Sequence, residues 1–73
     1  MTTPEYVPSR HTLIRMAERK ISADEIVDVL RNHHTRYTDP RGSEVMIGHP
    51  NGRRVKIVVA QGSCPPFIIT VAD

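Results

Sequence analysis

The chain has 73 residues, with ten basic and eight acidic side chains, and therefore a net charge of +2 at pH 7. From this length we expect one domain with a thin core rather than several domains. No apolar run approaches the roughly 20 residues of a membrane span, and the first residues lack the pattern of a signal peptide. The lone Cys64 cannot form an intramolecular disulfide. We therefore expect a cytoplasmic domain that does not associate with membranes.

Arginine dominates the basic side chains: eight of the ten are Arg and two are Lys. The planar guanidinium matches the oxygens of a phosphate, although a GC-rich genome also favours Arg over Lys. The positive charge lies in the second part of the chain, where residues 30–73 hold six basic and three acidic groups. This balance is compatible with nucleic-acid binding without requiring it.

The first helix is expected at about residues 10–20. Residues 1–8 contain two prolines and predict an extended lead-in, and Ser9 can cap the helix that follows. The spacing of its apolar residues predicts that four side chains face the core. These are Leu13, Ile14, Met16 and Ala17.

A second helix has a complete start signal at Ser22. Ser22 and Glu25 have the spacing of a capping box, and Ile21 and Ile26 have that of the hydrophobic staple around it. The apolar residues that follow predict a buried stripe, and the helix should end near Asn32.

From residue 35 the pattern changes to alternating apolar residues, which is typical of strands. We expect strands at 35–38, 44–49, 54–60 and 67–71, with turns at 39–42, 50–52 and 62–66. In the third strand, Val55, Ile57 and Val59 should face the core. The short connections predict an α+β fold in which two amino-terminal helices pack on one face of a four-stranded antiparallel sheet, in the order ααββββ. Residues 9–73 would form the single domain.

The opening helix carries a recognisable motif. It begins with His11 and continues through Arg15 and Arg19 to Ile21 and Ser22. With the final strand around Thr70, this motif resembles a family of small bacterial domains of unknown function, over residues 10–72. That family is similar in layout to RelE-like and BrnT-like toxins of toxin–antitoxin modules.

The resemblance implies a RelE-like fold and metal-free cleavage of RNA or of ribosome-bound mRNA, with a cognate antitoxin as a protein partner. This chain departs from the family pattern at Lys20, where Gly is usual. The departure argues against a tight left-handed turn at that position.

The candidate catalytic residues lie on the opening helix and the last strand. His11, Arg15 and Arg19 are four residues apart and form one stripe on a helix. His11 is the natural general acid or base, and the two Arg side chains are candidates to hold the scissile phosphate. Thr70 is a candidate to donate a hydrogen bond to that phosphate or to orient His11.

Three further residues are candidates for substrate binding. Arg54 and Lys56 can hold flanking phosphates, and His49 is a second candidate proton acceptor. If the helices cover the face of Val55 and Ile57, however, Arg54 and Lys56 point away from His11 unless His11 lies at the sheet edge.

Each of these roles has a structural alternative. His11 can pack under the sheet edge, and Thr70 is a common strand residue. Arg54 and Lys56 can form a solvated strand face. Arg15 and Arg19 can form ion pairs with nearby carboxylates, which are Glu18, Asp24 and Asp28.

The pattern predicts neither a metal nor a cofactor. His33 and His34 are adjacent and should point apart on a regular element, and no Cys or carboxylate stands at ligand spacing. Two functions remain open, so the sequence leaves undecided whether the chain is an enzyme. One is a metal-independent endoribonuclease of the RelE-like toxin type. The other is a non-catalytic binding module that docks a partner protein, or a second copy in a homodimer, along an exposed sheet edge.

Overall fold

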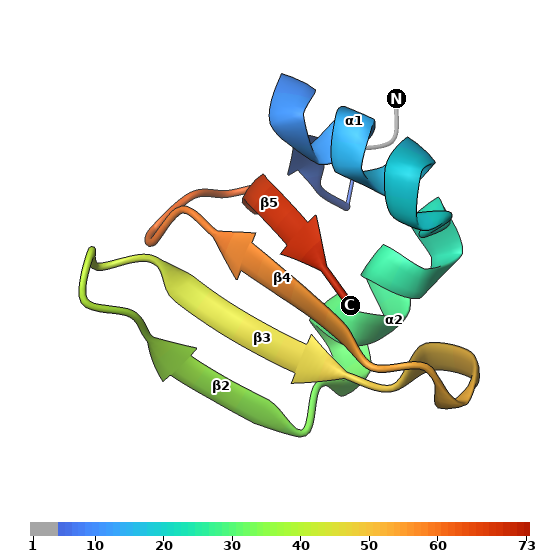
Figure 1. The fold of residues 1–73 in the computed structure, drawn as a ribbon. Helices are drawn as coiled ribbons and strands as arrows, with labels where there is room; N and C mark the ends of the chain where they lie inside the picture. Colours follow the sequence, from blue (N-terminus) through green and yellow to red (C-terminus); the bar gives the residue numbers. More distant parts are fainter. Residues whose placement is uncertain (1–4) are drawn as a thin grey trace.

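The computed structural model describes residues 5–73 (Figure 1). Within these residues the chain forms two α-helices, one short 3-10 helix and five strands. In chain order they are β1 (Val7–Pro8), α1 (Arg10–Arg19), α2 (Ala23–Asn32), β2 (Thr35–Thr38), β3 (Glu44–Gly48), η1 (Pro50–Gly52), β4 (Val55–Val59) and β5 (Phe67–Ala72). No helix in this part of the chain has the length and apolar character needed to cross a bilayer.

The sheet is five-stranded and mixed, with the strand order β1-β5-β4-β3-β2. The α+β class is right, but the prediction of a four-stranded antiparallel sheet in the RelE-like order ααββββ is wrong. Val7 and Pro8 form a short strand parallel to β5, opposite Phe67 and Ile68. Proline lacks the N–H that a central strand needs, yet an edge strand tolerates it. Residues 1–4 of the expected lead-in lie outside the described residues.

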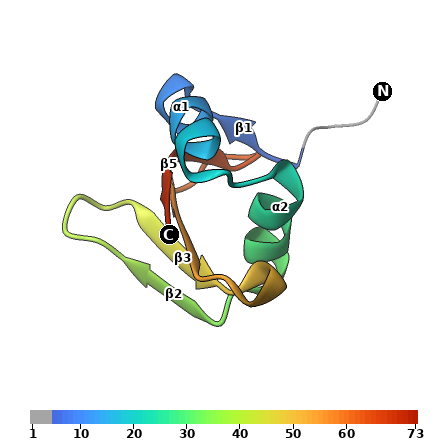
Figure 2. The ribbon, with the colours of Figure 1, turned by 45° about the vertical axis from the view of Figure 1, so that its right-hand side comes forward.

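Helix α2 covers one face of the sheet, while α1 lies beside β5 and β1 (Figure 2). The core between α2 and the sheet consists of buried aliphatic side chains together with Met46. They are Ile21, Ile26, Val29, Met46, Val55, Ile57, Val59, Ile68 and Val71. A Cβ at Gly48 would lie 3.3 Å from Val29 Cγ2, so the lack of a side chain there lets α2 approach β3 closely.

The orientation of α1 differs from the prediction. Thr12 is fully buried, and its hydroxyl donates to the carbonyl oxygen of Ile68 at 2.7 Å. Leu13 and Ile14 are 54% and 50% exposed, and Ala17 is exposed as well. The prediction that these three face the core is therefore wrong, whereas Met16 does pack against it. Hydrogen bonds from polar side chains to the β5 backbone, rather than the apolar residues, fix the rotation of this helix.

The connection between the helices confirms one prediction and overturns another. The capping box is present: Glu25 N–H donates to Ser22 Oγ at 3.2 Å, and Ser22 N–H donates to Glu25 Oε1 at 3.0 Å. Lys20, however, adopts the left-handed conformation with φ 54°, and its N–H donates to the carbonyl oxygen of Met16. The expectation that Lys20 disfavours this turn is wrong, because the αL cap forms without glycine at a cost in strain.

Candidate nucleic-acid interface

Helix α1 runs alongside β5 in the same direction. At its start, Ser9 Oγ donates to the carbonyl oxygen of Ile69 at 2.8 Å. At its end, Arg19 Nη1 lies 3.7 Å from Asp73 Oδ1, directly after β5. The stripe of His11, Arg15 and Arg19 therefore borders β5, with His11 beside the first half of the strand and Arg19 beside its end.

Thr70 lies on the face of the sheet that α2 leaves open. Val71 and Ile57 are buried in the core and pair with each other across β4 and β5. Their neighbours Thr70 and Val58 also pair, and because side chains alternate along a strand they point to the opposite face. Lys56 pairs with Ala72 and shares this open face, one diagonal step from Thr70.

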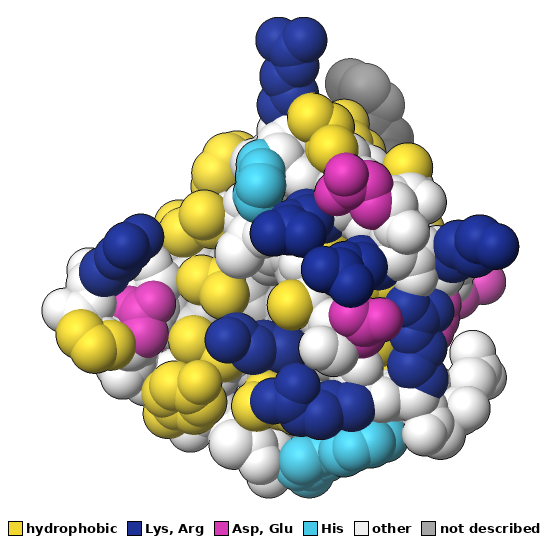
Figure 3. Space-filling view, in the orientation of Figure 1, with side chains coloured by type: hydrophobic (Ala, Val, Ile, Leu, Met, Phe, Trp, Pro, Cys, Tyr) yellow, Lys and Arg dark blue, Asp and Glu magenta, His cyan; other side chains and the backbone are white. Residues whose placement is uncertain are grey.

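The edge position of α1 brings the two predicted groups of basic residues to one side of the molecule. Figure 3 shows Lys and Arg side chains gathered over α1 and across the sheet below it, in the orientation of Figure 1. We call this the basic surface. The name stands for five residues: His11, Arg15 and Arg19 on α1, Lys56 on β4 and Arg54 directly before β4. Helix α1 contacts β5 and β1 at one edge of the sheet, which is the arrangement that a common surface for His11, Arg54 and Lys56 requires.

Most cations of the basic surface keep their donors available. Within residues 5–73, neither Arg15, Arg54 nor Lys56 forms an ion pair. Arg19 pairs with Asp73 rather than with a carboxylate of α1 or α2, and both side chains of that pair are exposed. An exposed pair at 3.7 Å is weak, so a phosphate can compete for Arg19.

Asp73 is the acidic member of this region. A hydrogen bond from Arg53 is the first cause that holds the pKa of the Asp73 carboxyl below its ordinary 3.8. Its carboxylate therefore stays charged at neutral pH and offsets part of the positive charge at the end of the stripe.

The structure does not bring His49 to His11. His49 follows β3, whereas His11 stands beside β5. The register places Gly48 opposite Val55 and Thr70 opposite Val58. Gly48 and Thr70 are thus two strands apart and offset by three residues along the strand direction, which corresponds to a distance of about 14 Å. His49, which follows Gly48, therefore lies far from Thr70 in the candidate site, and it contacts His34 instead.

Two residues of this region have no place in the sequence-based site. Tyr37 is 46% exposed and lies on the open face, in the row that continues through Val45 and Val58 to Thr70. The signal in the sequence that could have identified Tyr37 is an aromatic residue at an alternating position of a strand. Arg53 donates to the carbonyl oxygens of Arg19 and Lys20, which no local sequence pattern indicates.

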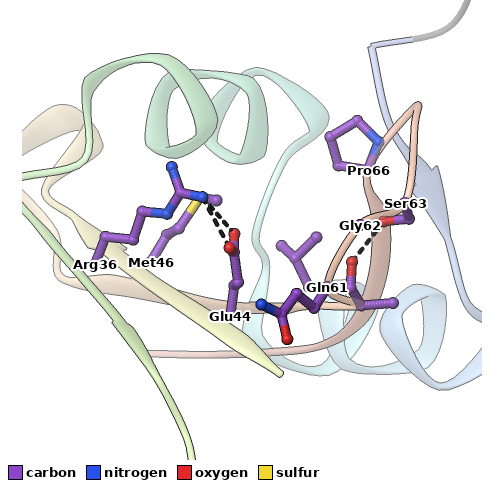
Figure 4. A pocket seen from close by; sticks show the side chains of 9 residues that line it. Arg36, Glu44, Met46, Gln61, Gly62, Ser63 and Pro66 are labelled. Carbon is purple, nitrogen blue, oxygen red and sulfur yellow. Dashed lines mark hydrogen bonds and ion pairs between the residues drawn. The ribbon is translucent and has the colours of Figure 1, made fainter. Parts of the chain in front are cut away.

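A hollow of about 490 Å³ lies on the other face of the sheet, beyond the part that α2 covers (Figure 4). Its lining includes Met46 and Val59 from the core face and the Gly62–Ser63 turn. Arg36 Nη2 donates to both carboxylate oxygens of Glu44 at 2.8 Å on its rim. Because Glu44 neutralises Arg36, the hollow adds no available cation to the basic surface.

Residues 5–73 contain no group of three or more metal-ligating side chains. The model of the family described as a domain of unknown function, DUF4258, matches residues 9–73 of this chain. No curated protein and no solved structure matches the chain significantly.

Proposed function

This chain belongs to the DUF4258 family of domains of unknown function, and we propose that it is a metal-independent endoribonuclease of the toxin type. The observation that carries the proposal is the course of α1 along β5. Helix α1 carries His11 and two arginines, and it is held along β5, the strand whose Thr70 lies on the open face. The opening motif resembles a family of small bacterial domains that is similar in layout to RelE-like and BrnT-like toxins, and this resemblance supports the same class of reaction.

The residues of the basic surface suit a transesterification within RNA. The 2′-oxygen attacks the adjacent phosphorus, the bond to the 5′-oxygen breaks, and a 2′,3′-cyclic phosphate and a 5′-hydroxyl result. His11 exchanges a proton with the entering or the leaving oxygen. Arg15 and Arg19 stabilise the negative charge that grows on the phosphate, and the Thr70 hydroxyl donates to one of its oxygens.

The open face offers a path for the rest of a single-stranded RNA. Lys56 and the exposed Arg54 can hold phosphates that flank the cleaved one. Tyr37 stands three strands from Thr70 in the same row, about 14 Å away. Its exposed ring can stack on an unpaired base, as aromatic side chains on RNA-binding sheets do. Free RNA and ribosome-bound mRNA both present such segments.

A non-catalytic binding module is the second candidate. One observation favours it: β2 forms an edge of the sheet, pairs with β3 alone, and is exposed over residues 36–38. The unpaired backbone groups of an edge strand can accept a strand from a partner, such as a cognate antitoxin or a second copy of the chain.

A cleavage assay on a labelled single-stranded RNA separates the two candidates. We expect His11→Ala to lower the cleavage rate by about 10²–10⁴-fold, while EDTA leaves the rate of the unmodified protein unchanged. His33→Ala is the matched control, because His33 contacts the carbonyl oxygen of Val29 on α2, away from the basic surface. Melting temperatures of both variants report whether the fold is intact.

Growth provides a second readout of the same proposal. Expression of the chain should arrest growth, and His11→Ala should relieve the arrest. Absence of both RNA cleavage and growth arrest with the unmodified protein would contradict the nuclease and favour the binding module. Activity that EDTA abolishes and zinc or manganese restores would contradict the metal-independent mechanism.

A further inference from the structure

His34 and His49 form a close pair that joins two ends of neighbouring strands. His34 directly precedes β2 and His49 directly follows β3. Because β2 and β3 are antiparallel, with Thr35 opposite Ile47, the start of one strand meets the end of the other. His34 Nε2 lies 2.7 Å from His49 Nδ1, and both side chains are exposed.

The two rings meet through their nitrogen atoms. The ring planes differ by 18° and the ring centres are 4.7 Å apart. With ring centres 4.7 Å apart, the two nitrogens can be 2.7 Å from each other only if each lies on the side of its ring that faces the other ring. One nitrogen then carries a proton and the other a lone pair, so the contact is an N–H···N hydrogen bond. No local sequence pattern indicates this pair, because fifteen residues separate its members.

We propose that His34 and His49 together bind a divalent transition-metal ion, such as Cu²⁺, Ni²⁺ or Zn²⁺. Neutral imidazole is a preferred ligand of these ions, whereas Ca²⁺ and Mg²⁺ prefer oxygen. Replacing the shared proton by a metal ion requires that both nitrogens present lone pairs to one point.

The geometry is close to what a metal ion needs. Zinc–nitrogen bonds of about 2.0–2.1 Å at a tetrahedral angle place two ligand nitrogens about 3.3 Å apart. The observed 2.7 Å between His34 Nε2 and His49 Nδ1 therefore has to widen by about 0.6 Å, starting from the contact seen here. Exposed side chains can pivot by this amount without displacing the core.

A second hydrogen bond prepares His34 for this role. His34 Nδ1 lies 2.9 Å from Thr35 Oγ1. When His34 donates this bond, its Nε2 carries the lone pair that faces His49. Metal-binding histidines commonly donate their other ring N–H to an oxygen in this way, which fixes the tautomer and the ring orientation.

The site would have an open coordination sphere. Residues 5–73 provide no third His, Cys, Asp or Glu in this cluster, so water completes the coordination. With two protein ligands the order of affinities should follow the Irving–Williams series, with Cu²⁺ bound most tightly. The inference stands apart from the proposed nuclease, whose His11 lies beside β5.

Calorimetric titration of the untagged protein with Cu²⁺, and separately with Zn²⁺, tests the proposal. We expect one site per chain, and a loss of affinity of at least tenfold in both His34→Ala and His49→Ala. His11→Ala and His33→Ala are the matched controls and should bind as the unmodified protein does. The His33 control matters because it separates the His34–His49 pair from chelation by the adjacent His33 and His34.

Thr35→Val adds a test of the second hydrogen bond. It removes the oxygen that holds His34 Nδ1 and should lower the affinity for the metal ion several-fold. Circular dichroism checks that each variant is folded. The proposal is overturned if the protein binds neither ion at millimolar concentration. It is also overturned if His49→Ala binds as tightly as the unmodified protein, or if His33→Ala loses as much affinity as His34→Ala.

Discussion

The Arg53 guanidinium donates a hydrogen bond from Nη1 to the backbone carbonyl oxygen of Lys20, 3.0 Å away. Nη2 donates to the carbonyl oxygen of Arg19 as well, and it reaches Asp73 Oδ2 at 3.3 Å. Glu25 Oε1, at the start of α2, lies 4.0 Å from Nη1. A cation at the carboxyl end of α1 also interacts favourably with the helix dipole. Arg53 thus joins the end of α1, the start of α2 and the end of β5.

We predict that Arg53→Ala lowers the free energy of unfolding by about 1–3 kcal/mol, since it removes hydrogen bonds from a charged donor. Arg53→Lys should recover only part of the loss, because an ammonium cannot reach two carbonyl oxygens and a carboxylate in a fork. Urea denaturation measures both. Arg54→Ala is the matched control: it should change stability by no more than about 0.5 kcal/mol and weaken RNA binding instead. Equal stability losses in the two variants would contradict this division of roles.

Lys20→Gly should stabilise the protein. Lys20 holds a left-handed conformation with φ 54°, which costs a residue with a Cβ about 1–2 kcal/mol. Glycine removes that cost but loses more entropy on folding, so the expected net gain is about 0.5–1 kcal/mol. Lys20→Ala keeps the Cβ and should bring no such gain. Thermal denaturation of both variants checks the prediction, and a gain in Lys20→Ala equal to that in Lys20→Gly would refute it.

Stability should depend on Asp73 in acid. The pKa of its carboxyl is lowered in the folded chain, first by the hydrogen bond from Arg53. A lowered pKa means that the contribution is complete above the ordinary value of 3.8 and is lost as pH falls through the folded value. Asp73→Asn should therefore flatten the stability profile below about pH 4. Denaturation midpoints between pH 2 and pH 6 measure this, and parallel profiles of the two proteins would rule it out.

Tyr37→Ala should weaken binding of single-stranded RNA. Stacking on a base contributes about 1–3 kcal/mol, which corresponds to a loss of about 5- to 150-fold in affinity. Tyr37→Phe keeps the ring and should bind nearly as well as the unmodified protein. Fluorescence anisotropy at constant salt provides the measurement. If Tyr37→Ala binds like the unmodified protein while Arg15→Ala does not, the phosphate contacts stand and the stacking role is wrong.

Local signals in the sequence predicted the elements of this fold better than their arrangement. The capping box of Ser22 and Glu25 and the alternation through Val55, Ile57 and Val59 depend on neighbours in the chain, and both are confirmed. Val7 and Pro8 carry too short a pattern to indicate a strand, and they form one only because β5 offers an edge.

The same distinction applies to the candidate site. The four-residue spacing of His11, Arg15 and Arg19 needs only a helix to form a stripe. Whether that stripe meets Thr70 depends on how α1 lies against β5, which the bonds of Ser9 and Thr12 to distant carbonyl oxygens decide. The same holds for the His34–His49 pair, because cross-strand register brings the two residues together.

The pairing of Val7 with Phe67 has a consequence for how the chain folds. Ser9 and Thr12 find their acceptors at Ile69 and Ile68, which are 60 and 56 residues further along the chain. Contacts of such sequence separation carry a large loop-closure entropy and form late. During synthesis, α1 has nothing to dock on until β5 has emerged. The meander of β2, β3 and β4 can pair first, so the basic surface should be among the last parts of the molecule to assemble.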